Sequence, residues 1–215
     1  GNATFTGTLS EVSAQEVTVN YASSNNTATA GSDYTAASGT VTIAAGATSA
    51  TFNVPVSADT LDEASETATM TLSSPTNATI SDATGTLTIV DDDTAPTLSI
   101  NDVSYTESGT GGNATFTVTL SEVSAQNVTV DYASSDVSTT AGSDYTSSTG
   151  TVTILAGNTT QTFNVPVLVD TLDEVNETST LTLSNPTNAT ISDATGTLTI
   201  VDDDATPSLS INDVS

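Results

Sequence analysis

Residues 39–56 read GTVTIAAGATSATFNVPV and decide the fold class. Val41 and Ile43 alternate with threonine, and Phe52, Val54 and Val56 alternate with polar residues or proline after a glycine-containing turn. Successive side chains of a β-strand point to opposite faces, so this pattern predicts two strands that each bury one face. The same alternation recurs at Phe5/Leu9, Val17/Val19/Tyr21, Ala68/Met70/Leu72 and Leu87/Ile89.

Gly, Asn, Asp and Pro separate these runs at a spacing of roughly ten residues, and no helical period of useful length interrupts them. One buried face per strand is typical of an antiparallel sandwich. Seven short strands in about 105 residues fit an immunoglobulin-like sandwich. The sequence therefore predicts an all-β protein built from such sandwiches in tandem.

The chain repeats itself at an offset of 111 residues. GNATFTGTLSEVSAQEVTV (1–19) returns as GNATFTVTLSEVSAQNVTV (112–130), and ATISDATGTLTIVDDD (78–93) returns at 189–204. Near-identity of this kind indicates recent duplication, and we interpret the chain as two periods of a longer array.

The repeat also sets the expected domains. TLSINDVS (97–104) precedes the second GNATF and is expected to be the first strand of the second domain, while SLSINDVS (208–215) copies it. We expect a sandwich without its first strand at 1–96, a complete sandwich at 97–207, and the first strand of a following repeat at 208–215. The connector Thr94-Ala95-Pro96-Thr97 is short and stiffened by proline.

The charge composition excludes several functions. The chain holds 26 acidic residues and no Lys, Arg, His or Cys, which gives a formal net charge of −26. It has no imidazole base, thiolate nucleophile or Schiff-base lysine. It also lacks the basic footprint of a nucleic-acid-binding protein, and no apolar run approaches the ~20 residues of a membrane span. Without Trp and with few aromatic residues, it also lacks the usual sugar platforms of a glycan hydrolase, so we expect no enzyme.

The acidic residues concentrate where strands are expected to end. Each repeat has an acid in GSDY, a group in the motif DTLDE, and a run of three aspartates after the last strand; the second repeat adds Glu107. The first repeat holds Asp33; Asp59, Asp62, Glu63 and Glu66; and Asp91, Asp92 and Asp93. The second holds Asp144; Asp170, Asp173, Glu174 and Glu177; and Asp202, Asp203 and Asp204.

Loops of a sandwich gather at its two poles, so these acids can converge. Two carboxylates about 5 Å apart repel by roughly 3 kcal/mol at an effective dielectric constant near 20, and no Lys or Arg offsets this. Calcium takes six to eight oxygen ligands with flexible geometry and suits such a cluster better than magnesium. The alternative is that the acids are solvated loop ends that keep the surface soluble, as on a halophilic protein.

GSDYTAASGTVTI, the aliphatic strand entering the acidic DTLDEASE loop, and the terminal IVDDD together resemble the Calx-beta domain. The resemblance spans nearly the whole chain, twice. It implies a seven-stranded immunoglobulin-like sandwich in a family in which some members bind several calcium ions at one end and others bind none.

By position, the resemblance implies calcium ligands in both repeats. In the first they are Asp33, Asp59, Glu63, Glu66, Asp91, Asp92 and Asp93. In the second they are Glu107, Asp144, Asp170, Glu174, Glu177, Asp202, Asp203 and Asp204. Asp62 and Asp173 are weaker candidates and are expected to be solvated. The first repeat has no counterpart of Glu107 within the sequence, so its site is expected to be less complete.

These patterns favour a calcium-binding structural repeat of a secreted or cell-surface protein, such as an adhesin stalk or extracellular fibre. Metal would stiffen its domains and junctions, and its partners would be calcium ions and neighbouring repeats, without nucleic acid or membrane insertion. One alternative is a regulatory calcium-sensor tandem. Another is a spacer array without metal that assembles head to tail by strand donation, each chain filling the missing first strand of the next.

Overall fold

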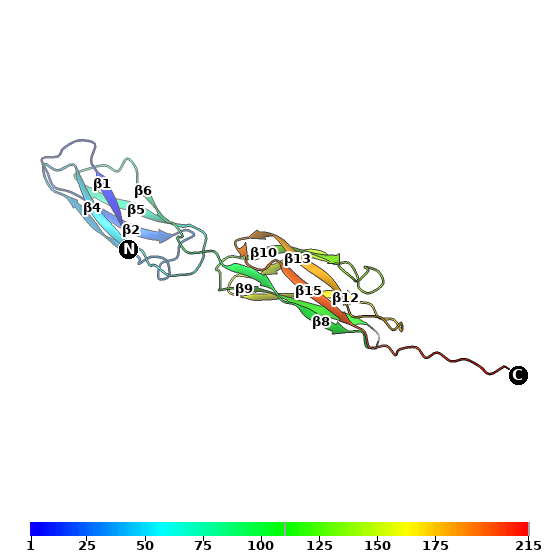
Figure 1. Cartoon of the computed structure of the whole chain (residues 1–215). Coiled ribbons are helices and arrows are strands. Elements are labelled where there is room, and N and C mark those ends of the chain that lie inside the picture. Colours follow the sequence, from blue (N-terminus) through cyan, green and yellow to red (C-terminus); the bar gives the residue numbers. More distant parts are fainter. Residues whose placement is uncertain (110, 215) are drawn as a thin grey trace. The chain divides into compact units, whose positions relative to one another are not determined.

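The computed structural model of the chain describes residues 1–109 and 111–214. The chain divides into two compact units, unit 1 (Gly1–Asp93) and unit 2 (Thr94–Ser215), each built of strands (Figure 1). Within the described residues, no helix is long and apolar enough to cross a membrane.

Unit 1 contains two sheets. β1 pairs antiparallel with β4, and the other four strands form a sheet in the order β3-β2-β5-β6. Val17, Val41 and Ile43 form one buried cluster, while Val54 and Met70 belong to a second. The strands of unit 1 are β1 (Asn2–Thr8), β2 (Val17–Asn25), β3 (Ser38–Ile43), β4 (Ser49–Pro55), β5 (Glu66–Thr76) and β6 (Thr84–Ile89).

Unit 2 has more strands and one continuous core. A five-stranded sheet has the order β11-β10-β13-β15-β8, and a four-stranded sheet has the order β12-β9-β7-β14. Phe116 and Val118 of the second sheet share one core with Leu181 and Leu198 of the first. The strands of unit 2 are β7 (Thr97–Ile100), β8 (Val103–Thr106), β9 (Gly112–Leu120), β10 (Val128–Asp136), β11 (Thr149–Ile154), β12 (Thr160–Val167), β13 (Glu177–Thr187), β14 (Thr190–Ile191) and β15 (Thr195–Val201).

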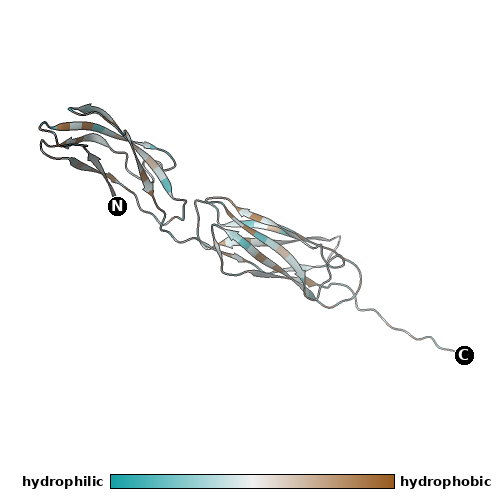
Figure 2. Ribbon diagram, turned by 90° about the horizontal axis from the view of Figure 1, so that it is seen from above, coloured by the Kyte–Doolittle hydropathy of each residue, from teal (hydrophilic) through white to brown (hydrophobic). Residues whose placement is uncertain are grey.

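The predicted fold class, tandem all-β sandwiches, is confirmed. Residues of different hydropathy alternate along the strands (Figure 2). The apolar side chains therefore lie on one face of each strand, where they form the buried clusters. Val41 and Ile43 are buried in β3, whereas the threonine between them is exposed. Most strand pairs are antiparallel, but β7 pairs parallel with β14, and β8 pairs parallel with β15.

The predicted strand at 97–104 is two strands in the structure. β7 adds to the four-stranded sheet, and β8 crosses to the five-stranded sheet and continues to Thr106. Asn101 and Asp102 lie between β7 and β8, and here side-chain oxygens, rather than backbone carbonyls, accept the N–H groups of neighbouring strands. The Asn101 carboxamide oxygen accepts the Thr117 N–H (2.6 Å), and an Asp102 carboxylate oxygen accepts the Thr197 N–H (2.7 Å).

The structure divides the units after Asp93 rather than after Pro96. Pro96 is buried in unit 2, and its carbonyl accepts the Thr190 N–H at 3.0 Å. At the other end of unit 2, residues 205–214 are assigned to no strand. The expectation of a strand at 208–215 includes Ser215, which lies outside the described residues.

Candidate metal centre

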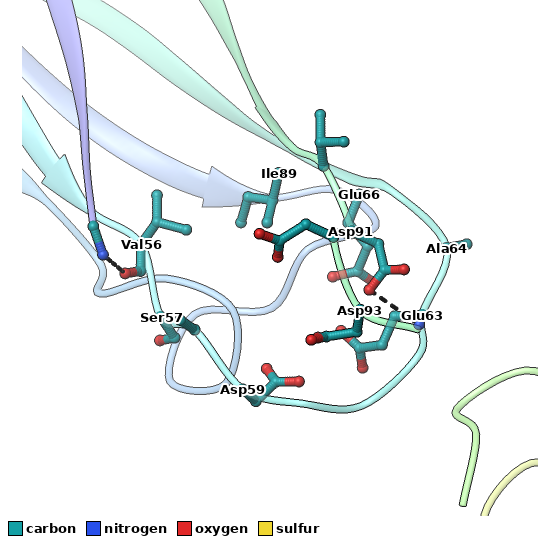
Figure 3. A pocket seen from close by; sticks show the side chains of 13 residues that line it. Val56, Ser57, Asp59, Glu63, Ala64, Glu66, Ile89, Asp91 and Asp93 are labelled. Atoms are coloured by element: carbon teal, nitrogen blue, oxygen red, sulfur yellow. Dashed lines mark hydrogen bonds between the residues drawn. The ribbon is translucent and has the colours of Figure 1, made fainter. Parts of the chain in front are cut away.

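Two segments of unit 1, the one between β4 and β5 and the one after β6, bring their acids to one pocket. The pocket has a volume of about 410 Å³, and Figure 3 shows carboxylates from different loops pointing into the same space. Its walls come from the end of β4, the β4–β5 loop and the chain after β6. Six of its lining residues are acidic, namely Asp59, Glu63, Glu66, Asp91, Asp92 and Asp93.

Asp33 comes from the GSDY turn, which is firmly anchored. The Thr29 N–H donates to a carboxylate oxygen of Asp33 (2.6 Å), and the Asp33 carbonyl accepts the Ser57 N–H (3.0 Å). Next to it, Tyr34 is buried and donates its hydroxyl to the Asn25 side-chain oxygen at 2.7 Å. These bonds hold Asp33 against the β4–β5 loop.

Carboxylate oxygens of Asp33, Glu63 and Glu66 all lie within 4.8 Å of one another, and we call these three residues triad 1. The loop that carries the glutamates is tied to the terminal aspartate run. The Glu63 N–H donates to Asp91 Oδ1 (3.3 Å), and the Asp91 N–H donates to Ser65 Oγ (3.4 Å). Two loops distant in sequence therefore share one acidic surface.

The electrostatics of triad 1 favour a bound cation. Burial raises the pKa of Glu63, and the charges of Asp59, Asp33, Asp91 and Asp93 raise it further. Burial and a hydrogen bond with Asp33 raise the pKa of Glu66. A raised carboxyl pKa means that the charged form is disfavoured without a partner, and a metal ion supplies such a partner.

Unit 2 repeats this arrangement. Carboxylate oxygens of Asp144, Glu174 and Glu177 lie within 4.8 Å of one another, and we call these residues triad 2. The Thr140 N–H donates to Asp144 Oδ2 at 2.5 Å, as Thr29 does to Asp33. Burial, the hydrogen bond with Asp144 and its negative charge raise the pKa of Glu177 to about 7.

Glu107 lies near the acidic residues of unit 2. It directly follows β8, its N–H donates to the Val201 carbonyl at 2.9 Å, and its side chain is 8% exposed. Burial raises the pKa of Glu107, and the charges of Asp170, Glu174 and Asp202 add to the effect. The first strand of unit 2 therefore delivers an acid to the same pole as triad 2.

Two carboxylate oxygens of the terminal aspartates of unit 2 are buried and unsatisfied. Asp202 Oδ1 and Asp204 Oδ2 are buried and have no hydrogen-bond partner. Burial raises the pKa of Asp204, and Asp202 and Asp203 raise it further. Buried carboxylate oxygens are normally bonded, so such atoms beside other acids fit the ligands of a hard cation.

The structure thus brings together residues from all three predicted groups in both units. The triads are the tightest part, whereas Asp59, Asp92, Asp170 and Asp203 are exposed at the margin. Asp59 and Asp170 each accept a backbone N–H two residues ahead, from Leu61 (2.9 Å) and Leu172 (2.7 Å). These bonds shape the loops and leave the second carboxylate oxygen for a metal ion.

The two weaker candidates differ from each other. Asp62 is buried, at 6% exposed, contrary to the expectation that it is solvated. Asp173 is exposed as expected, and its Oδ1 accepts the Thr206 hydroxyl at 3.5 Å. The two loops differ in sequence only slightly here, since DEAS in the first loop is DEVN in the second.

Sequence reasoning missed the residues that fasten these loops. Ser65 Oγ accepts the Asp91 N–H, and Asn176 Oδ1 accepts the Asp202 N–H at 3.2 Å. The two residues occupy the same repeat position, just before the last glutamate of each triad. The sequence offered one signal for them: this position carries a side chain with an oxygen atom in both repeats, although the residue type changes from serine to asparagine.

The chain is similar to known proteins over both units. The sequence profile of the Calx-beta domain matches residues 3–93 and again residues 91–204. Among solved structures, CBD12 from CALX1.2 is 16% identical with a TM-score of 0.44, and the match covers 93% of each chain. The apo-form Calx CBD1 domain is 20% identical with a TM-score of 0.45 and is matched over its full length by 52% of this chain. Among curated protein sequences, none is detectably similar. Because the two profile matches span nearly the whole chain, it belongs to the Calx-beta domain family.

Proposed function

We propose that each unit binds calcium at its acidic pole and that the tandem serves as a metal-stabilised structural repeat. The observation that carries the proposal is the pair of triads, whose carboxylate oxygens lie within 4.8 Å of one another in a chain without Lys or Arg. Some members of the Calx-beta family bind calcium, and the membership of this chain in that family supports the same conclusion.

The donor set suits calcium better than other common metals. It consists of carboxylates, without the thiolates or imidazoles that zinc prefers. In unit 2, the two triad glutamates, Asp144, Glu107 and the unpartnered oxygens of Asp202 and Asp204 offer more oxygens than an octahedral magnesium usually takes from protein. Magnesium also retains several water ligands in most protein sites.

Metal at this pole would act by tying loops together. The acids come from the GSDY turn, the β4–β5 or β12–β13 loop, and the chain after β6 or β15. An ion that binds the folded arrangement and not the unfolded chain stabilises the fold by mass action. Asp91, Asp92 and Asp93 directly precede the connector, so we propose that the ion also restricts the chain there. A stalk or fibre outside the cell is the setting in which such stiffening serves a repeat array.

A regulatory calcium sensor is the second candidate, and one observation favours it. In unit 2 the buried oxygens Asp202 Oδ1 and Asp204 Oδ2 lack a hydrogen-bond partner, whereas no acid in the described part of unit 1 has such an atom. Two unequal sites would fill at different calcium concentrations and give a graded response. Micromolar affinity would support a sensor, and millimolar affinity would support a structural role outside the cell.

Thermal unfolding of the 215-residue chain in millimolar calcium, in magnesium and in a chelator tests the proposal. Calcium at a hundred times its dissociation constant is expected to stabilise the fold by about 2.7 kcal/mol, and magnesium by much less. Isothermal titration then gives the affinities that separate the two candidates. Equal melting temperatures in calcium and chelator would overturn the calcium assignment and leave the acids as surface charge.

A further inference from the structure

In each unit, a single side-chain oxygen at the end of a strand fastens both ends of the GSDY turn. In unit 1 this atom is Asn25 Oδ1, at the end of β2. It accepts the Ala30 N–H (2.9 Å) and the Tyr34 hydroxyl (2.7 Å). Asp33 of triad 1 lies between these two donors in the chain, so Asn25 positions the triad aspartate without belonging to the triad.

Unit 2 uses the same bonds with a different group. Asp136, at the end of β10, occupies the position 111 residues after Asn25. Its Oδ1 accepts the Tyr145 hydroxyl (2.6 Å) and the Ala141 N–H (3.2 Å), and Asp144 of triad 2 lies between these donors. The two repeats therefore keep the anchor of the turn and exchange a neutral amide for a carboxylate.

The carboxylate of Asp136 stands near triad 2. Asp136 is opposite Ser179 in the ladder between β10 and β13, and Glu177 lies two residues before Ser179 on the same face of β13. Side chains in such a diagonal relation are about 7–8 Å apart. In unit 1, Asn25 is likewise opposite Ala68, two residues after Glu66.

The Tyr145 hydroxyl reports the same proximity. Burial raises the pKa of this hydroxyl, and the hydrogen bond with Asp136 and the charges of Asp136 and Asp144 raise it further. Both carboxylates therefore act on one buried group, and Tyr145 remains a hydrogen-bond donor. Asp136 Oδ1 is already engaged by two donors, so this residue acts through the turn and through its charge.

We propose that the Asn25/Asp136 position sets the relative calcium affinities of the two triads. This inference rests on the proposed function. Both residues position the turn, and Asp136 adds to triad 2 a negative charge that Asn25 does not give to triad 1. At a distance of roughly 10 Å, partly screened by water and salt, such a charge strengthens the binding of a divalent ion roughly three- to tenfold.

Exchanging the two residues tests the charge with the anchor intact. Asp136→Asn introduces the amide that already holds the equivalent donors in unit 1, and Asn25→Asp makes the reverse change. We expect Asp136→Asn to raise the calcium dissociation constant of unit 2 roughly three- to tenfold, and Asn25→Asp to lower that of unit 1 by a similar factor. Each unit is compared with its own wild-type value.

The two sites can be followed separately in the whole chain. The amides of Thr29 and Thr140 donate to the aspartates of triad 1 and triad 2. Calcium titrations monitored by the NMR signals of these amides therefore give one dissociation constant for each unit. A variant in one unit is expected to leave the constant of the other unit unchanged.

The chain supplies a matched control on the same strands. Asn20 Oδ1 accepts the Thr40 hydroxyl (2.8 Å), and Asp131 Oδ1 accepts the Thr151 hydroxyl (2.6 Å). Asp131→Asn and Asn20→Asp therefore make the same exchange of charge at another repeated position. Asp131 is five residues before Asp136, or about 17 Å along the strand, which exceeds the Debye length of about 8 Å at physiological salt. We expect the control variants to change neither dissociation constant.

Removing the anchor separates positioning from charge. Asn25→Ala leaves the Ala30 N–H and the Tyr34 hydroxyl without their acceptor, so we expect it to weaken calcium binding in unit 1. Asn25→Asp is expected to strengthen binding at the same position, which a residue needed only for packing would not do. Melting temperatures in a chelator check that unit 1 remains folded in both variants.

The outcomes distinguish this inference from the proposed function. Unchanged affinity of unit 2 in Asp136→Asn, or an equal change in Asp131→Asn, would overturn the inference while calcium binding itself stands. Weaker binding of unit 1 in Asn25→Asp would also overturn it. If the wild type shows no calcium binding at either amide, both the inference and the proposed function are wrong.

Discussion

The effect on stability of removing one charge from triad 2 is expected to depend on calcium. We expect Glu177→Gln to stabilise the protein in a chelator and to weaken its response to calcium. Without metal, the carboxylates of Asp144, Glu174 and Glu177 lie within 4.8 Å of one another. At that separation two charges repel by about 3.5 kcal/mol at an effective dielectric constant near 20. Glutamine keeps the shape, donates to Asp144 as the protonated glutamate does, and carries no charge.

The size of the effect follows from the pKa of Glu177. Burial, the hydrogen bond with Asp144 and that residue's charge raise this pKa from 4.5 to about 7. One pKa unit corresponds to about 1.4 kcal/mol, so ionising Glu177 at pH 8 would cost roughly 3 kcal/mol for a fully buried group. Because the side chain is half-buried, solvent screening lowers the expected gain to about 1–2 kcal/mol, or a rise of about 3–8 °C in the melting temperature of unit 2.

In calcium the same substitution is expected to remove a ligand. The wild-type protein is expected to gain about 2.7 kcal/mol at a hundredfold excess over the dissociation constant. Glu177→Gln is expected to lose most of that gain, so its advantage over the wild type shrinks or reverses. Differential scanning calorimetry at pH 8, in calcium and in chelator, measures both quantities.

Glu122→Gln is the control, because it changes the charge equally at an exposed glutamate outside the triads. It is expected to leave the melting temperature nearly unchanged in both buffers. A fall of equal size for Glu177→Gln in calcium and in chelator would refute the reasoning. Glu177 would then be a packing residue rather than a member of a charged metal site.

Three further predictions concern the wider structure. In a chelator, the raised carboxyl pKa values should make the free energy of unfolding highest below pH ~4.5 and lower it as the pH rises toward ~7. Saturating calcium should reverse this dependence of stability on pH. Melting temperatures measured across this pH range, with and without calcium, check both expectations. Tyr145→Phe should cost about 1.5–3 kcal/mol in urea unfolding because its hydroxyl donates to the Asp136 carboxylate (2.6 Å), whereas Tyr34→Phe should cost about 1 kcal/mol because its acceptor is a neutral amide; equal losses would contradict this. Phe116→Ala should destabilise unit 2 by about 3–5 kcal/mol, and Phe5→Ala should destabilise unit 1 by less because Phe5 is only half-buried; losses of similar size would contradict this difference in packing.

Much of the fold could be predicted because it depends on local pattern. Val41, Ile43, Phe52 and Val54 follow a period of two, and that period alone requires strands with one buried face. The triads were predictable because strand ends of a sandwich gather at its poles. Repetition at 111 residues showed that the acids recur at the same positions.

Other features depend on contacts that the pattern does not encode. The break between β7 and β8 arises because Asn101 and Asp102 take up backbone N–H groups of two different strands. The burial of Asp62 and the exposure of Asp173 arise in loops of nearly the same sequence. Period and charge describe a residue and its neighbours along the chain, whereas these outcomes depend on what lies across the sheet.

The first strand of unit 2 links the core to the metal centre. Leu98 and Ile100 in β7 fill the core, and Glu107, directly after β8, reaches the acidic pole with its N–H bonded to Val201 beside Asp202. Docking of β7 and β8 therefore brings Glu107 to the acidic pole. Neutralising the charge of Glu107 in turn favours the conformation in which these strands are docked. Two processes that favour the same conformation strengthen each other by the same free energy. We therefore expect calcium binding and the docking of this strand to be coupled in unit 2.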